Sequence, residues 1–271
     1  MDWTGHVCVV TGAGTGIGLG IAEVFAKAGC RVVIGEVNRE SGKTAAANLQ
    51  QHYGQSLFIP VDVSKDAECR SLIAETIRIY GRIDTLINNA GVNFVKPTLE
   101  MTVDDWDRVV NVDLRGTFLC SRYALEYMVK AGHGSIINIA SVHSKATLGG
   151  AAPYAASKGG VVQMTASMAI EFAPFGVRIN ALSPGLIDTL IWQQIQEVAS
   201  DKAAAVQHWM DNIPMGRVGT SREMGQVALF LASDEASYVT GANLLADGGM
   251  TSLLINRERY TSQTLEGQYK S

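Results

Sequence analysis

Tyr154 and Lys158, in the segment Tyr-Ala-Ala-Ser-Lys, are the residues whose types and spacing point most directly to chemistry. On a helix, residues four positions apart share one face, so the lysine ammonium can lie near the phenol. A neighbouring cation favours the phenolate, and lowering the phenol pKa from about 10 to ~7 would take about 4 kcal/mol. The pair is therefore a candidate general acid and base, although the same spacing also occurs by chance in many helices.

A glycine-rich segment near the N-terminus could bind a phosphate group. An apolar run of strand length, 6–10, is followed by Thr11-Gly12-Ala13-Gly14-Thr15-Gly16-Ile17-Gly18 and then by a helical pattern that closes at Gly29. Such a turn presents outward-pointing backbone N–H groups, and the missing side chains let a pyrophosphate approach. The spacing is G-x-x-x-G-x-G, because Ile17 breaks the G-x-G-x-x-G pattern. A plain tight turn is the alternative interpretation.

Glu36 follows the next apolar run, 31–35, and lies 18 residues beyond Gly18. An acid at about this separation, at the end of a second strand, accepts hydrogen bonds from the hydroxyls of an adenosine ribose. It would also repel a 2′-phosphate, so Glu36 favours NAD over NADP. Arg39 is close enough to weaken that preference, and a solvent-exposed loop acid is the alternative.

Strand and helix patterns alternate along the whole chain. Near-continuous Val, Ile and Leu strands separated by helices indicate a parallel sheet that is covered on both faces. The predicted strands are 6–11, 31–36, 56–61, 83–88, 134–140, 176–182 and 242–246. The predicted helices are 17–29, 39–53, 65–80, 102–113, 115–131, 154–173, 188–211 and 220–233.

Polar and glycine-rich segments follow the predicted strands one after another. The glycine turn, Glu36 and Asp62 follow the first three strands, and three further segments follow the fourth, fifth and sixth: Asn88-Asn89-Ala90-Gly91, Ser141 and Pro184-Gly185. In an open parallel sheet, ligands bind outside the carboxyl ends of the strands. This convergence on one rim predicts a ligand site there.

Taken together, these motifs resemble the short-chain dehydrogenase/reductase family, in its compact single-domain type, from about residue 5 to about residue 250. The resemblance rests on Thr11-Gly12-x-x-x-Gly16-Ile17-Gly18, Asp62-Val63, Asn88-Asn89-Ala90-Gly91, Asn111, Ser141, Tyr154-x-x-x-Lys158 and Pro184-Gly185. It implies a single-domain α/β Rossmann fold over 1–271, with a doubly wound seven-stranded parallel sheet. It also implies a nicotinamide cofactor and hydride transfer to or from a carbonyl carbon.

Four residues form the predicted catalytic set. As a phenolate, Tyr154 would take the proton of a secondary hydroxyl while hydride leaves for the nicotinamide. Lys158, the resemblance implies, also holds the ribose hydroxyls of the nicotinamide. Ser141, thirteen residues before Tyr154, could donate a hydrogen bond to the substrate oxygen. The resemblance makes Asn111 the fourth member, supporting a water that links Lys158 to solvent; a satisfied polar helix residue is the alternative.

The cofactor site that the resemblance implies extends along the whole rim. Asp62 and Val63 would meet the adenine, whereas Ile187 and Thr189 would contact the carboxamide. No metal site is expected. The full set is Gly12, Thr15, Gly16, Ile17, Gly18, Glu36, Asp62, Val63, Asn89, Ala90, Gly91, Tyr154, Lys158, Pro184, Gly185, Ile187 and Thr189.

The predicted substrate pocket holds few charges. Its candidates are Asn93, Ser141, His143, Ala151, Tyr154, Leu186 and Trp192. His143 could hydrogen-bond a polar substrate, although a solvated loop histidine is the commoner case. A pocket with His143 and Asn93 suits a neutral sugar, polyol or related secondary alcohol. Cyclic ketones, steroids and 3-oxoacyl compounds stay open as alternatives.

Two further segments and the assembly have expected roles. The amphipathic stretch 188–213 fits a mobile lid over the substrate, where the resemblance also places one; an ordinary packed helix is the alternative. Residues 250–271 form a C-terminal tail that is either solvated or docked on another subunit. The resemblance favours a homotetramer in which the helix from Tyr154 packs against its symmetry mate.

Composition narrows the class of protein. The chain has 271 residues, 47% hydrophobic and 18% charged, which is enough for one sizeable core. Its net charge of −4, without a long basic run, argues against nucleic acid as a partner. The start lacks a signal-peptide pattern, and no apolar run reaches the ~20 residues that span a membrane. Cys8, Cys30, Cys69 and Cys120 show no metal spacing, and buried thiols in the reducing cytoplasm are expected.

The sequence thus predicts an NAD-dependent dehydrogenase or reductase that acts on CH–OH groups. A non-catalytic NAD-binding regulator is the hypothesis from another class, and it is weakened by the presence of Ser141, Tyr154 and Lys158. A sugar-nucleotide epimerase or dehydratase would carry a larger C-terminal substrate domain, for which 271 residues leave no room.

Overall fold

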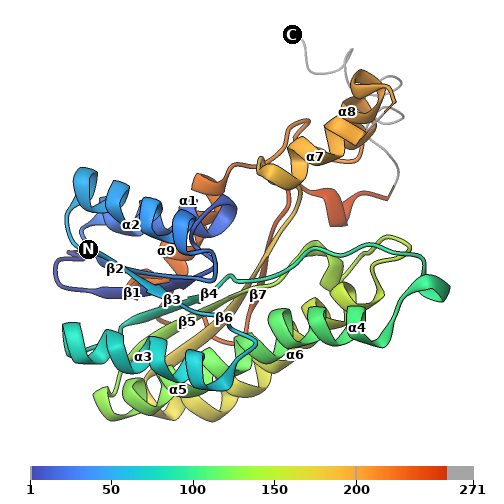
Figure 1. The fold of residues 1–271 in the computed structure, drawn as a ribbon. Helices are drawn as coiled ribbons and strands as arrows, with labels where there is room; N and C mark the ends of the chain where they lie inside the picture. Colours follow the sequence, from blue (N-terminus) through green and yellow to red (C-terminus); the bar gives the residue numbers. More distant parts are fainter. Residues whose placement is uncertain (1, 199, 255–271) are drawn as a thin grey trace, which may run out of the picture.

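The apolar runs of the sequence form one parallel sheet, because their Val, Ile and Leu side chains are buried on both of its faces. The computed structural model describes residues 2–198 and 200–254. The strand order is β3-β2-β1-β4-β5-β6-β7 (Figure 1). The bounds are β1 (Val7–Thr11), β2 (Arg31–Glu36), β3 (Ser56–Pro60), β4 (Thr85–Asn88), β5 (Gly134–Ile139), β6 (Val177–Pro184) and β7 (Asn243–Ala246). The predicted seven-stranded, doubly wound parallel sheet is confirmed.

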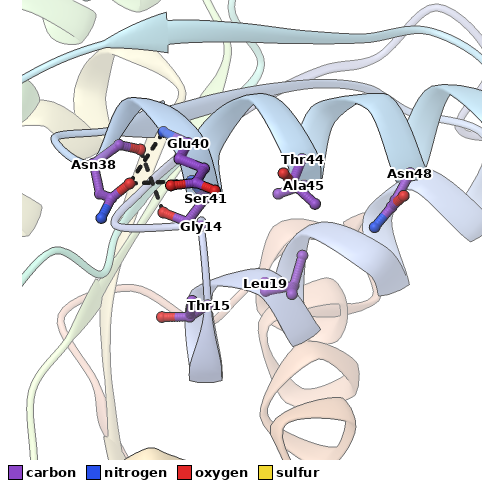
Figure 2. A pocket seen from close by; sticks show the side chains of 9 residues that line it. All are labelled: Gly14, Thr15, Leu19, Asn38, Glu40, Ser41, Thr44, Ala45 and Asn48. Carbon is purple, nitrogen blue, oxygen red and sulfur yellow. Dashed lines mark hydrogen bonds between the residues drawn. The ribbon is translucent and has the colours of Figure 1, made fainter.

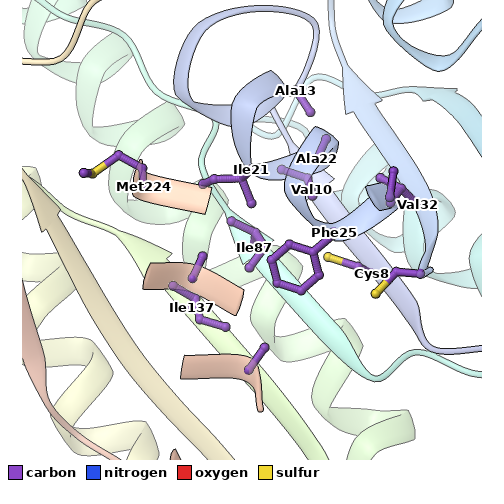
Figure 3. Packing of buried hydrophobic residues seen from close by; sticks show 14 of the residues in the cluster. Cys8, Val10, Ala13, Ile21, Ala22, Phe25, Val32, Ile87, Ile137 and Met224 are labelled. Carbon is purple, nitrogen blue, oxygen red and sulfur yellow. The ribbon is translucent and has the colours of Figure 1, made fainter. Parts of the chain in front are cut away.

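Helices cover both faces of the sheet. One face carries α1 (Gly16–Ala28), α2 (Arg39–Tyr53) and α9 (Ser221–Ala232), and the other carries α3 (Asp66–Tyr80), α5 (Gly116–Ala131) and α6 (Ala152–Phe172). Figure 3 shows the core under the first face, where Phe25 of α1 lies among strand residues such as Val10 and Val32. All four cysteines are buried and unpaired, as expected.

The two helices predicted at 102–113 and 115–131 are joined without a break. α4 (Val103–Val110) begins with a capping box between Thr102 and Asp105, and it continues through a π-helical turn, η2 (Asn111–Arg115), into α5. A π-turn widens the helix locally and occurs often at functional sites. Here it directs Asp113 into the protein interior, where its side chain is fully buried.

The predicted helix 188–211 is two helices, α7 (Leu190–Val198) and α8 (Lys202–Asp211). Asp201 begins the second one, because its side chain accepts a hydrogen bond from the Ala204 N–H at 3.0 Å. Aspartate is a strongly preferred N-cap residue, so it starts a new helix where the hydrophobic pattern alone predicts continuity.

A buried hydrogen-bond network joins the strand ends to the helices below them. Asn88 Nδ2 donates to Asn138 Oδ1 and to Ser121 Oγ, each at 2.8 Å. Asn138 Nδ2 in turn donates to Thr165 Oγ1 at 2.8 Å. The network therefore links β4 and β5 to α5 and α6, and Asn88 braces the sheet against these helices.

Within the described ranges, none of the helices is both long and apolar enough to cross a membrane.

The contact between α1 and α9 gives a stability prediction. A Cβ on Gly20 would lie 2.7 Å from the carbonyl carbon of Ser221, which is backbone and cannot move aside. Glycine to alanine in a helix normally stabilises by about 1 kcal/mol. We expect Gly20→Ala instead to lower the free energy of unfolding by about 1–3 kcal/mol, measured by denaturant titration. Glu23→Ala, on the exposed side of α1, is the matched control and should change it by less than about 0.5 kcal/mol. Equal unfolding free energies of the Gly20→Ala and Glu23→Ala proteins would contradict the close packing of α1 against α9.

Candidate functional site

The glycine turn after β1 leaves an open helix N-terminus. Gly12 and Gly16 have φ values of +64° and +59°, in the left-handed region that favours glycine. Thr15, the N-cap of α1, makes no side-chain capping hydrogen bond. The first N–H groups of α1 are therefore not capped by this residue, and together with the helix dipole they suit an anion such as a pyrophosphate.

The loop after β4 is bound to the glycine turn. Asn89 Nδ2 donates to the carbonyl oxygens of Thr11 and Gly12 at 3.0 and 2.9 Å. The backbone N–H groups of Asn89 and Ala90 donate to Thr11 Oγ1 at 3.0 and 3.1 Å. A Cβ on Gly12 would lie 2.7 Å from the Ala90 Cα. Two groups of predicted cofactor residues thus form one backbone surface, with Thr11 as the bridge.

Glu36 lies beside the same turn. Its Oε2 accepts the Gly14 N–H at 3.0 Å, and its Oε1 accepts the Asn38 N–H at 3.0 Å. Asn38 Oδ1 accepts the N–H groups of Glu40 and Ser41 at 3.0 and 3.1 Å, so the N-terminus of α2 is already capped. The end of β2 therefore presents carboxylates, and Asn38 occupies the donors that could otherwise hold a phosphate.

A pocket of about 380 Å³ lies between α1 and α2, next to this cap (Figure 2). It is lined by Gly14, Thr15, Leu19, Asn38, Glu40, Ser41, Thr44, Ala45 and Asn48. Its charged lining residue is an acid, Glu40, and this does not suit a phosphate group.

Asp62 and Val63 follow β3 at the same rim. The Val61 N–H donates to the Glu36 carbonyl oxygen at 3.1 Å, so the ends of β2 and β3 are adjacent. Asp62 Oδ1 accepts hydrogen bonds from the backbone N–H and the hydroxyl of Ser64 at 3.0 and 2.7 Å. Val63 is buried. The predicted adenine-side residues thus lie along one continuous edge.

Tyr154 and Lys158 share one face of α6, as predicted. Lys158 Nζ lies 5.5 Å from the centroid of the Tyr154 ring and donates to the Ile139 carbonyl oxygen at 3.1 Å. A Cβ on Gly91 would lie 3.4 Å from Nζ. Burial opposes the charge of Lys158, but Asp113 and Tyr154 outweigh it and raise the pKa of Lys158. The lysine is therefore an ammonium throughout the neutral range.

The residue of η2 that lies beside Lys158 is Asp113, which the sequence did not single out. Asp113 Oδ2 lies 3.3 Å from Lys158 Nζ, and Asp113 Oδ1 accepts the Val92 N–H at 2.8 Å. Asn111, predicted as the fourth catalytic residue, is only half-buried. Two residues apart on a helix, the two side chains point to nearly opposite sides, so one position alone can face Lys158. Asp113 occupies that position, and the role of Asn111 in supporting a water stays a prediction.

His143 lies next to Tyr154, and Ser141 begins the short turn that carries His143. Ser141 is buried, and its hydroxyl accepts the His143 N–H at 3.2 Å at the start of a short 3₁₀ turn, η3 (Val142–Ser144). The His143 and Tyr154 ring centroids are 5.2 Å apart in an edge-to-face arrangement. Burial lowers the pKa of His143, and its Nδ1 is 2.8 Å from Thr147 Oγ1. A neutral imidazole thus leaves Nε2 to pair with a polar substrate.

The segments after β6 and β4 complete the rim. A Cβ on Gly16 would lie 3.7 Å from Thr189 Cγ2, so Thr189 lies over the glycine turn, and Ile187 is buried just before it. Pro184 ends β6, and Gly185 packs against Asp247. Of the predicted substrate residues, Ala151 and Trp192 are buried, Leu186 is half-buried and Asn93 is exposed.

Sequence reasoning missed three residues of this site. Thr11 is part of the glycine motif, but its role in holding Asn89 needs the three-dimensional contact between β1 and β4. Asn38 carries a recognisable N-cap signal before 39–53. Asp113 could have been noticed as a carboxylate within an otherwise apolar stretch, since buried acids are rare without a partner.

Comparisons with known proteins agree with this geometry. The family model described as enoyl-(acyl carrier protein) reductase matches residues 12–251. An uncharacterised oxidoreductase of Thermotoga maritima is 39% identical over 94% of this chain and 99% of its own length. A 3-oxoacyl-[acyl-carrier-protein] reductase of the same organism is 37% identical over 92% of this chain and 99% of its own. The crystal structure of a candidate gluconate dehydrogenase from Agrobacterium tumefaciens superimposes with a TM-score of 0.88 at 31% identity, covering 93% and 98% of the two chains.

The bridge between β1 and the β4 loop can be tested by removing one oxygen. Thr11→Val keeps the shape of the side chain but leaves two N–H groups without their acceptor, and Thr11 is only 1% exposed. We expect a loss of about 1–3 kcal/mol in unfolding free energy and weaker binding of dinucleotide, measured by denaturation and calorimetry. Thr15→Val, at an exposed position of the same turn, should leave stability nearly unchanged. A Thr11→Val protein as stable as the wild type would contradict the assigned role.

Proposed function

Because the chain belongs to the short-chain dehydrogenase/reductase family, whose members use a nicotinamide cofactor, we propose that it interconverts a secondary alcohol and a ketone. The observation that carries this proposal is the Tyr154–Lys158 pair, on one face of α6 beside Ser141 and His143. An aromatic hydroxyl next to a buried ammonium is the arrangement that proton exchange with a substrate oxygen requires.

The residues fit the cofactor on three counts. The N-terminus of α1 carries no side-chain cap and suits the pyrophosphate. Glu36 lies beside the turn, where it would accept hydrogen bonds from the adenosine ribose. Lys158 has three N–H donors, of which one binds the Ile139 carbonyl oxygen while the ammonium pairs with the Asp113 carboxylate, so a donor remains for a ribose hydroxyl. When bound, the nicotinamide supplies the acceptor or donor of hydride.

The side chains of the site transfer the proton of the substrate hydroxyl and orient the substrate. In oxidation, the Tyr154 oxygen takes the proton of the substrate hydroxyl, and in reduction it returns that proton. The Lys158 ammonium favours the deprotonated oxygen. The Ser141 hydroxyl donates a hydrogen bond to the substrate oxygen as charge develops there. His143, neutral and in contact with the Tyr154 ring, binds a second polar group of the substrate.

We favour NAD over NADP. Glu36 and Glu40 place two acids at the end of β2 and the start of α2. The Asn38 side chain already accepts the first backbone N–H groups of α2, so these cannot bind a phosphate. The two carboxylates would repel a 2′-phosphate, and few free N–H donors remain there to bind it. Arg39, the cation in this segment, is the residue that would attract it.

The proposed substrate is a neutral sugar, polyol or related secondary alcohol. The neutral His143 beside Tyr154 supports a hydroxylated substrate, and the structural similarity to a candidate gluconate dehydrogenase supports carbohydrate chemistry. The second candidate is a 3-oxoacyl compound, favoured by the 37% identical 3-oxoacyl-[acyl-carrier-protein] reductase.

Two further proposals concern a segment and the assembly. We propose that 188–213, which contains α7 and α8, closes over the substrate; amide exchange there no faster than in the sheet, without ligand, would contradict this. The predicted C-terminal tail continues into 255–271, outside the described residues. A cytoplasmic homotetramer that packs through α6 is the proposed assembly, and sedimentation of the full chain tests it.

The proposed chemistry predicts the behaviour of Tyr154→Phe. Loss of the hydroxyl removes the proton carrier, so kcat for oxidation of a secondary alcohol should fall by about 10²–10⁴-fold. The measurement is NADH absorbance with D-sorbitol, D-gluconate, 3-hydroxybutyrate and cyclohexanol as substrates. Tyr80→Phe, in α3, is the matched control and should keep wild-type rates. A fully active Tyr154→Phe protein would exclude this mechanism, and wild-type protein that turns over no alcohol would favour a non-catalytic cofactor-binding protein.

The cofactor preference predicts the effect of Glu36→Gln. Glutamine keeps the acceptor for one backbone N–H but removes the charge, so discrimination against NADP should weaken by about tenfold in kcat/KM, or ~1.4 kcal/mol. Glu40→Gln, at an exposed position in the first turn of α2, should change the ratio less. If Glu36→Gln preferred NAD as strongly as the wild type does, the carboxylate would not set the preference.

A further inference from the structure

Lys158 and Asp113 form an ion pair in the interior of the site. Nζ lies 3.3 Å from Oδ2, and the two side chains are 5% and 0% exposed. Charges at this depth are screened far less than surface charges. Each of them therefore acts strongly on any titratable group nearby, and the nearest such group on α6 is the hydroxyl of Tyr154.

We propose that Asp113 is a positioning residue for the reaction proposed above, on which this inference rests. It fixes the Lys158 ammonium and offsets part of the positive charge that Tyr154 experiences. The ammonium lies 5.5 Å from the Tyr154 ring centroid and favours the phenolate, while the adjacent carboxylate acts in the opposite sense. The pair thus favours the phenolate less than a lone lysine would.

The geometry also explains how Asp113 holds the lysine. The Val92 N–H fixes Oδ1 at 2.8 Å, and this leaves Oδ2 directed at Nζ. The Ile139 carbonyl oxygen holds a second ammonium proton at 3.1 Å. The carbonyl oxygen from β5 and the carboxylate from η2 together hold the ammonium close to Tyr154.

Other titratable groups near the pair are few. Burial raises the pKa of the Asp113 carboxyl, while Lys158, the Val92 N–H and, more weakly, Arg108 of α4 favour the carboxylate. His143 of η3 contacts the Tyr154 ring, and burial keeps it neutral. β5 carries no titratable side chain, and Arg178 of β6 binds carbonyl oxygens at the opposite end of its strand. The sign of the Asp113 effect is therefore set by the pair itself.

The test is the pH dependence of Asp113→Asn. Asparagine keeps the oxygen that accepts the Val92 N–H but removes the charge, so deprotonation of Tyr154 becomes easier. We expect the midpoint of the kcat/KM profile for oxidation to move about one unit toward lower pH. Below the midpoint, the rate relative to its plateau rises about tenfold. The substrate is whichever of D-sorbitol, D-gluconate, 3-hydroxybutyrate and cyclohexanol the wild-type protein oxidises fastest.

A second readout needs neither substrate nor cofactor. The ultraviolet absorbance of the phenolate, taken as the difference from the corresponding Tyr154→Phe protein, titrates the same hydroxyl directly. Its midpoint should move in the same direction in Asp113→Asn. Asp107→Asn, which removes a carboxylate from the exposed side of α4, is the matched control and should leave both midpoints unchanged.

Each outcome decides the proposal. A shift toward lower pH in Asp113→Asn, with none in Asp107→Asn, supports it. Unchanged midpoints in a folded Asp113→Asn protein overturn it. If that variant fails to fold, Asp113→Ser takes its place, and failure of both to fold assigns Asp113 a purely structural role. Wild-type protein without any alcohol oxidation contradicts the proposed function instead, and the phenolate titration then still tests this inference.

Discussion

The buried ammonium of Lys158 is the interaction on which the site depends. A charge at 4% exposure persists only where several elements supply partners, and here β5 provides a carbonyl oxygen, η2 a carboxylate and α6 the tyrosine. Each partner must arrive from a different part of the chain. The position of the Tyr154 hydroxyl, the proposed proton carrier, is consequently set by the fold as a whole rather than by α6 alone.

The parallel sheet supplies the platform for this arrangement. Its carboxyl edge gathers the turn after β1, the acid after β2 and the loop after β4, and hydrogen bonds such as those from Asn89 to Thr11 and Gly12 connect them laterally. Beneath the edge, the chain of hydrogen bonds from Ser121 through Asn88 and Asn138 to Thr165 anchors the strand ends to the helices. Backbone groups therefore form the cofactor surface, and side chains complete the chemistry at one end.

The fold and much of the rim could be predicted from sequence because they rest on local patterns. Apolar strand runs, the glycine turn and the Tyr154–Lys158 spacing each act within a short segment, and all lie where the pattern predicts. The predictions that differ depend on contacts distant in sequence or on helix geometry. Asp113 escaped notice because hydrophobic spacing does not reveal a π-turn, and the 188–211 pattern does not show the N-cap at Asp201.

The extra backbone width of η2 has an evolutionary consequence. A π-turn is commonly produced by inserting one residue into an α-helix. Removing a single residue from 111–115 would restore ordinary helical winding and rotate the preceding helix by about 100° relative to α5. Single-residue deletion here would therefore change which side chains face Lys158, so the length of this short segment constrains the site in addition to the identity of Asp113.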